Sequence, residues 1–258
     1  MNAFVRIYAI AENTFREAIR NKLLYTLFGF SLLMIGSGVL LATLSYVEVD
    51  EILQDMGIAS IRFFSAGIAI FVGIGLIHNE VDRRTIFTIL SKPVSRTEFL
   101  IAKWAGLTAT VWLNLFLMAC TFAAVSLLSG AAVGLDHAVA IALIGLELMV
   151  LVAIATLFSA VTTPMLAACF TLGLWLIGHL SRDLEALGRQ SELEGVSSVA
   201  QFVFYVMPDF EVFNKTLEAV HGLPISGTEV AFALVYGIGY TVCTLSLGSM
   251  IFSRRDFK

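Results

Sequence analysis

Long apolar runs alternate along this chain with short segments that hold most of its charged residues. Leu23 to Leu44 is an uncharged run of 22 residues. As a helix rising ~1.5 Å per residue, it exceeds the ~30 Å hydrocarbon core of a bilayer. Similar runs recur to the end of the chain, so the pattern predicts an all-α membrane protein with a single transmembrane domain over residues 1–258.

The run from Ala138 to Ser181 is too long for one crossing, and its only charged residue is Glu147. Thr163 and Pro164 lie near its middle. A threonine N-cap followed by proline at the first helical position lets one helix end and the next begin without losing a backbone hydrogen bond. We therefore expect two spans here. The six predicted spans are Leu23–Leu44, Ile58–Ile77 with Arg62 near one end, Ala105–Ser129, the two that meet at Thr163, and Val230–Ser253.

Polar segments flank these spans and differ in character. Residues 1–22 have apolar residues at helical spacing opposite charged ones, which predicts an amphipathic helix on the membrane surface, although a helix packed on protein gives the same pattern. Residues 181–229 predict two or three short helices. Their stretch GVSSVAQFVFYVM is apolar enough to dip into the outer leaflet or to pack as a cap.

Composition supports a membrane setting, because 58% of the residues are hydrophobic, 14% are charged, and the mean hydropathy is +0.88. The net charge of −4 hides an asymmetry. Twelve of the sixteen basic residues lie in residues 1–22, in residues 79–104 or after residue 253. Short cytoplasmic loops retain positive charge during insertion, so these segments and both termini are predicted to be cytoplasmic.

The segment 79–104 between spans two and three has the features of an ordered loop. A short helix with an apolar face is predicted to end at Pro93, since proline disfavours a helical conformation in the residue before it. Ser95 and Glu98 then form a capping box that begins the next helix. Exposed apolar residues with basic flanks suit docking to a soluble partner, and they equally suit an anchor on anionic headgroups.

The stretch NEVDRRTIFTILSKPVSRTEFLIAKWAG resembles the intracellular loop of permeases of the type 2 ABC exporter class. In those permeases an acidic residue, a basic-Thr pair, a Leu-x-x-Pro-x-x-Arg run and a lysine recur in this order. The resemblance extends to the N-terminal helix, the six spans and the long segment before the last span. The ATPase-coupling residues that it implies, with the apolar Phe87 added, are Glu80, Arg84, Thr85, Phe87, Leu90, Pro93, Arg96 and Lys103.

The resemblance implies a permease in the bacterial inner membrane that works as a dimer with a second permease copy or homologue and two ABC ATPase subunits. Residues 79–104 would be the cytoplasmic coupling helix, and residues 181–229 a re-entrant gate. This chain would be no enzyme and would hold no cofactor, with ATP and magnesium bound by the ATPase. Indeed, it lacks the G-x-x-x-x-G-K-[ST] loop that cradles phosphates. Membrane lipid and periplasmic components are further expected partners, and nucleic acid is not.

Glu147 is the intramembrane polar residue that needs an explanation. A carboxylate at bilayer depth costs on the order of 3 kcal/mol, so a partner or a water-filled cavity must offset it. We predict a structural hydrogen bond to another helix, with Thr110 and Asn114 as candidate partners. The main alternative function, an ion-coupled secondary transporter or channel, would use Glu147 as its ion site. A membrane scaffold for an envelope complex is a third possibility.

Overall fold

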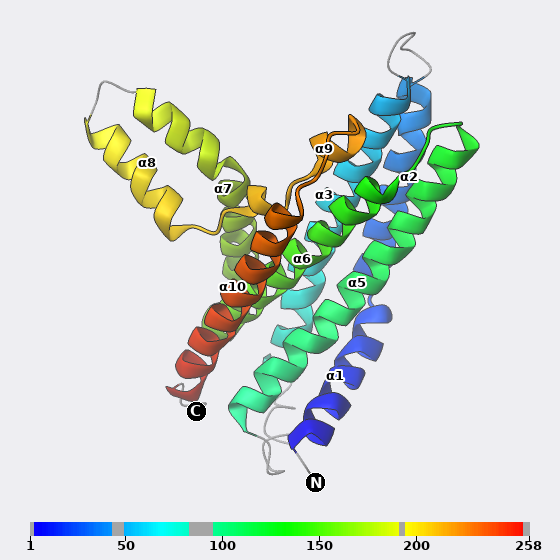
Figure 1. Cartoon of the computed structure of the whole chain (residues 1–258). Helices are drawn as coiled ribbons and strands as arrows, with labels where there is room; N and C mark the ends of the chain where they lie inside the picture. The colour runs from blue at the N-terminus through cyan, green and yellow to red at the C-terminus, as the bar shows by residue number, and fades with distance from the viewer. Residues whose placement is uncertain (1–2, 43–48, 83–94, 191–193, 255–258) are drawn as a thin grey trace.

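The computed structural model describes residues 3–42, 49–82, 95–190 and 194–254, and within these ranges it contains helices and no strands (Figure 1). Six of the described helices are long and apolar enough to cross a membrane. The all-α class and the six predicted spans are thus confirmed. The six helices are α2 (Lys22–Ala42), α3 (Val49–Asp82), α5 (Arg96–Leu128), α6 (Leu135–Val161), α7 (Pro164–Gln190) and α10 (Gly227–Arg254).

The predicted break between spans four and five is confirmed. Helix α6 ends at Val161 and α7 begins at Pro164, and the backbone N–H of Thr162 still donates to Phe158 O at 2.9 Å. Helix α6 then lies in the middle of the bundle, in contact with α3, α5, α7 and α10. Most of its side chains are buried, so any polar group on it must find a partner inside the protein.

Helix α3 differs from the prediction at its start. It begins at Val49, and its candidate span runs from Asp50 to Gly75. Acidic residues in a first helical turn are stabilised by the helix dipole, and Leu53 is buried, so the acidic segment before Ile58 is helical instead of a loop. The expectation that Arg62 lies near one end of this span is therefore wrong. Arg62 lies well inside the span.

Helix α1 (Ala3–Ile19) packs against α5. The two helices approach closely at Gly106, where a Cβ atom would lie only 2.5 Å from Ala11 O and 2.8 Å from Thr14 Cβ. Thr14 and Ala18 are buried in this contact, while Phe4, near the start of the helix, is 78% exposed. The helix predicted in residues 1–22 is present, and its location at a membrane surface stays a prediction.

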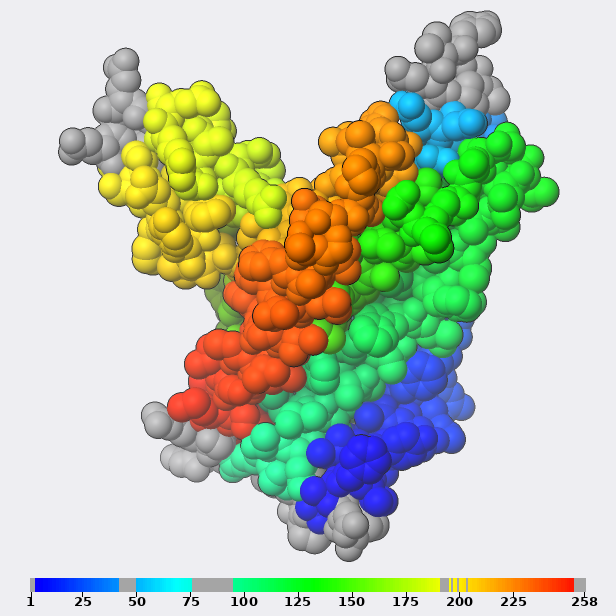
Figure 2. All heavy atoms as spheres, viewed as in Figure 1, coloured from blue at the N-terminus to red at the C-terminus, as the bar shows by residue number. Residues whose placement is uncertain are grey.

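The segment after α7 contains three short elements, namely α8 (Glu194–Val206), η1 (Phe210–Phe213) and α9 (Thr216–Val220). Helix α7 itself continues past Ser181 to Gln190, and α8 packs back against it. Figure 2 shows an open wedge between this α7–α8 hairpin and the part of the chain that contains α9. Both termini lie at the opposite end of the bundle, beside the start of α5 (Figure 1).

Candidate functional site

A polar cluster surrounds the Glu147 carboxylate, which is completely buried on α6. One carboxylate oxygen, Oε1, accepts a hydrogen bond from Trp175 Nε1 at 2.8 Å and lies 3.0 Å from His179 Nε2. The other, Oε2, lies 3.4 Å from Nε of Arg62. Helices α3, α6 and α7 thus each contribute a polar group at one point in the bundle.

His179 extends this cluster to the segment outside the spans. Its Nδ1 lies 2.9 Å from Oε1 of Glu211 in η1, and Asn214 Nδ2 donates to Glu211 Oε2 at 3.0 Å. We call the set Arg62, Glu147, Trp175, His179, Glu211 and Asn214 the buried network.

Proton placement in the buried network follows from the number of donors. A neutral imidazole has one N–H, so it can donate to only one of Glu147 and Glu211, whereas an imidazolium donates to both. With His179 doubly protonated, it and Arg62 balance the two carboxylates. Burial raises the pKa of Glu211, but the hydrogen bonds from His179 and Asn214 outweigh this effect and hold the pKa below its usual value.

Local features hold η1 in position against α7. A Cβ atom on Gly178 would overlap the Phe210 ring and lie 2.6 Å from Pro208 O, so glycine permits the close approach. Asp209 caps η1 by accepting from Glu211 N at 3.0 Å, and its Oδ2 accepts from Arg182 Nε at 2.8 Å. Phe210 is fully buried, which fixes η1 beside His179.

The predicted partners of Glu147 are wrong. Thr110 Oγ1 donates to Gly106 O in its own helix at 2.9 Å, and the buried Oδ1 of Asn114 has no hydrogen-bond partner within the described residues. The face of α6 toward α5 is marked by Gly145, whose carbonyl accepts from Trp112 Nε1 at 2.8 Å. Glu147 is two residues further on, about 200° around the helix, and so faces α3 and α7.

One feature of the sequence could have predicted the contact between Glu147 and His179. Glu147 and His179 are each 16 residues from Thr163, at the break between α6 and α7. Two antiparallel helices joined by so short a connection place residues equally far from the turn at the same depth. The contributions of Arg62 and Glu211 depend on tertiary packing and carried no comparable local signal.

A cavity of about 460 Å³ lies beside the buried network, and Arg62, Phe63, Trp175, His179 and Asn214 are among its lining residues. Nε and Nη2 of Arg62 are buried and make no hydrogen bond within the described part of the chain. The Glu147 carboxylate, 3.4 Å from Nε, supplies the opposite charge beside them. Across the described ranges, no three His, Cys, Asp or Glu side chains converge in a group that could hold a metal ion.

A second polar cluster lies at the start of α5. The predicted capping box is confirmed, with Glu98 N donating to Ser95 Oγ and Ser95 N donating to Glu98 Oε2, each at 3.1 Å. The Glu98 carboxylate also accepts from Arg6 of α1, from Nη2 at 2.6 Å and from Nε at 3.2 Å. This hydrogen bond raises the pKa of Arg6.

The same turn of α5 also contacts α10. Arg96 Nη1 donates to Phe252 O at 2.9 Å, and the hydroxyls of Thr97 and Ser249 are 2.6 Å apart. The Phe99 and Phe252 rings stack with centroids 6.3 Å apart. We call this set the α5 anchor; it consists of Arg6, Ser95, Arg96, Thr97, Glu98, Phe99, Ser249 and Phe252.

Three of the predicted coupling residues fall in described helices. Glu80 belongs to the last turns of α3, Arg96 is part of the α5 anchor, and Lys103 is buried in α5 with its Nζ 5.8 Å from the centre of the Phe99 ring. The other five lie outside the described residues, so their predicted role rests on the sequence. These are Arg84, Thr85, Phe87, Leu90 and Pro93.

Six apolar helices, a fully buried carboxylate and a charged cluster at one end define a multi-pass α-helical membrane protein. The chain matches the family model described as ABC-2 family transporter protein over residues 8–257, and it therefore belongs to the ABC-2 transporter family. It is accordingly a permease of an ABC transporter, as the sequence resemblance indicated. A search of curated proteins finds no match.

Proposed function

We propose that this chain, paired with a second permease copy or homologue, forms the pathway of an ATP-driven exporter and is coupled to two cytoplasmic ATPase subunits. The observation that carries the proposal is the family match over nearly the whole chain. The lack of a phosphate-binding loop in the sequence supports a separate ATPase that binds ATP and magnesium.

In this proposal, residues 79–104 dock on the ATPase. Closure of the ATPase subunits moves this segment, and the movement enters the bundle at Ser95. Helix α5 is continuous from Arg96 to Leu128. A helix of that length spans about 50 Å, so one rigid element connects the docking segment with the far end of the bundle. The α5 anchor joins α1 and α10 to the same movement.

Deeper in the bundle, the buried network is proposed to hold the segment 181–229 closed over the pathway. Glu211 of η1 is bound to His179 of α7, which is bound to Glu147 of α6. Moving η1 away would break the His179–Glu211 contact, so η1 would be either docked on α7 or released from it. ATP-driven rearrangement of α6 and α7 would supply the opening.

Ion-coupled transport remains the second candidate, and the observation that favours it is the cavity beside the network, which gives His179, a direct partner of Glu147, a route to water. Against it, the Glu147 carboxylate is already held by Trp175, His179 and Arg62, as a structural carboxylate would be. A scaffold for an envelope complex would require neither the network nor an ATPase.

Copurification separates the three candidates. The tagged chain is purified from native membranes in mild detergent, and the bound proteins are identified by mass spectrometry. The exporter requires a stoichiometric protein with a phosphate-binding loop, whose ATPase activity depends on the complex. A purified chain that transports in proteoliposomes under an ion gradient without such a partner would establish the ion-coupled alternative instead.

A further inference from the structure

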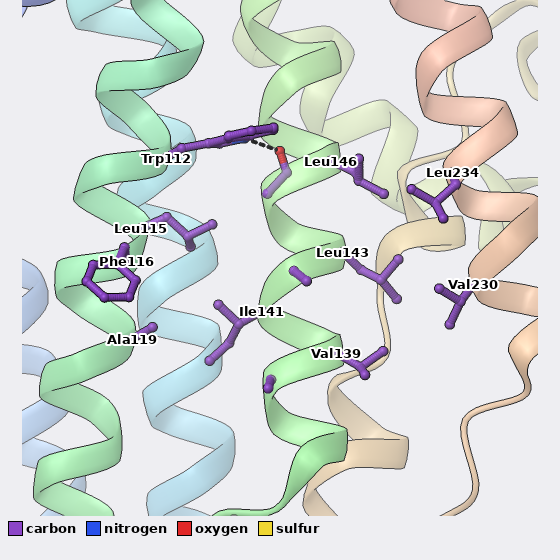
Figure 3. Close-up of a pocket in the computed structure, with 13 residues that line it drawn as sticks. Trp112, Leu115, Phe116, Ala119, Val139, Ile141, Leu143, Leu146, Val230 and Leu234 are labelled. Atoms are coloured by element: carbon purple, nitrogen blue, oxygen red, sulfur yellow. Dashed lines mark hydrogen bonds between the residues drawn. The ribbon is translucent and has the colours of Figure 1, made fainter.

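A groove on the outer face of the bundle lies between α5, α6 and α10, with α6 as its floor (Figure 3). Its volume is about 570 Å³, within the range of ligand-binding cavities. The floor is low because Ala138, Ala142 and Gly145 recur along one side of α6. Leu115 and Phe116 of α5 form one wall, and Val230 and Leu234 of α10 form the other; the remaining lining residues are Trp112, Ala119, Val139, Ile141, Leu143 and Leu146.

The lining selects a hydrocarbon occupant. None of the 13 residues that line the groove carries a charge. The single side-chain donor among them, Trp112 Nε1, is already bonded to Gly145 O at 2.8 Å (Figure 3). A polar ligand would lose its hydration here and gain no hydrogen bond in return, whereas hydrocarbon gains dispersion contacts with every wall.

The position of the groove favours an acyl chain as its occupant, because α5, α6 and α10 are all candidate membrane spans and the groove lies on the outer face of the bundle. On α6 it extends from Ala138 to Leu146, about 12 Å, which fits within one leaflet of a ~30 Å hydrocarbon core. It lies in the half of the bundle away from both termini, near the beginnings of α6 and α10.

We infer that this groove binds the acyl chains of a membrane phospholipid from the leaflet opposite the termini, as a site separate from the buried network. The lipid fills a space that the bundle leaves open between α5 and α10, and it thereby joins two helices that are both attached to the α5 anchor at their other ends. The inference depends on the chain being embedded in a membrane and does not depend on the coupled function.

The test is native mass spectrometry of the detergent-purified complex. The wild-type complex should retain phospholipid at about one molecule per chain. Ala142→Phe and the smaller Ala142→Leu fill the groove floor and should lower the retained lipid by about tenfold for Phe and less for Leu. Ala124→Phe adds the same ring at an exposed position of α5 that does not line the groove, and it should retain lipid as the wild type does.

Photo-crosslinking identifies the occupant directly. Phe116, which is 63% exposed and lines the groove, is replaced by benzoylphenylalanine and irradiated in native membranes. The expected product is the chain carrying the mass of a phospholipid. A covalent dimer of this chain, or a crosslink to another protein, would overturn the inference because a protein surface would then cover the groove. Unchanged lipid retention in both Ala142 variants would overturn it as well.

Discussion

The two polar clusters of this permease differ in how far they are removed from water. The buried network includes a carboxylate with 0% exposure and an Arg62 side chain with 13% exposure. In the α5 anchor, Arg6 and Glu98 keep 21% and 16% of their side-chain surface exposed, and they lie at the start of a helix. The same kind of ion pair is therefore expected to contribute unequally to stability in the middle of the bundle and at the start of α5.

The difference has a physical origin. Removing one partner of a buried pair leaves a charge that water cannot reach, while removing one partner of a partly exposed pair leaves a charge that water can solvate. The Arg62–Glu147 pair should thus behave as a unit that is either intact or broken. The α5 anchor should tolerate graded changes, which suits its proposed role of receiving movement from residues 79–104.

The largest effect is expected for Glu147→Leu. It leaves Arg62 without its counter-charge and Trp175 without an acceptor, so the free energy of unfolding should fall by about 3–5 kcal/mol. Glu147→Gln keeps an acceptor and should lose less while still transporting. Melting temperature and transport of both variants are measured beside Asp183→Leu, an exposed carboxylate on α7, which should change little. A stably folded Gln variant that does not transport would support ion coupling.

Features of this chain that depend on local sequence could be predicted, whereas those that depend on tertiary contacts could not. The six spans, the break before Pro164 and the capping box at Ser95 depend on local patterns, and all three were predicted correctly. The start of α3 was predicted wrongly. The span was expected to begin at the apolar Ile58, although a first helical turn favours the acidic residues that precede it. That Glu147 is buried followed from hydropathy. Its partners required knowing which side of α6 faces α7, and apolar residues all around α6 conceal that side.

An intermediate effect is expected for Glu98→Ala in the α5 anchor. The substitution removes the reciprocal cap on Ser95 N and the two hydrogen bonds from Arg6, so the melting temperature should fall, but by clearly less than for Glu147→Leu. Thermal melts of Glu98→Ala and Glu98→Gln measure this loss of stability. Glu12→Ala is the control, because the pair that Glu12 forms with Arg16 is exposed and lies within one helix. A loss as large as that of Glu147→Leu would contradict the contrast between the clusters.

The smallest effect is expected for Arg182→Ala. Its guanidinium pairs with Asp209, but Arg182 is 52% exposed, so the pair should contribute no more than about 1 kcal/mol and should weaken further with added salt. Melting temperatures at low and high salt measure this contribution. A strong destabilisation by Arg182→Ala that does not depend on salt would contradict this expectation. It would mean that the Arg182–Asp209 pair stabilises the chain more than its exposure indicates.

The proposed docking of residues 79–104 on an ATPase is best examined by copurification of that ATPase with Phe87→Glu and Leu90→Glu. A carboxylate placed on the predicted apolar face would be buried against the partner without a counter-ion, at a cost of several kcal/mol. Thr88→Glu adds the same charge to the polar side of the same predicted helix. If these residues dock, Phe87→Glu and Leu90→Glu lose the ATPase while Thr88→Glu retains it, and all three variants keep the wild-type melting temperature. Full retention of the ATPase and normal transport in Phe87→Glu and Leu90→Glu would contradict the proposed docking.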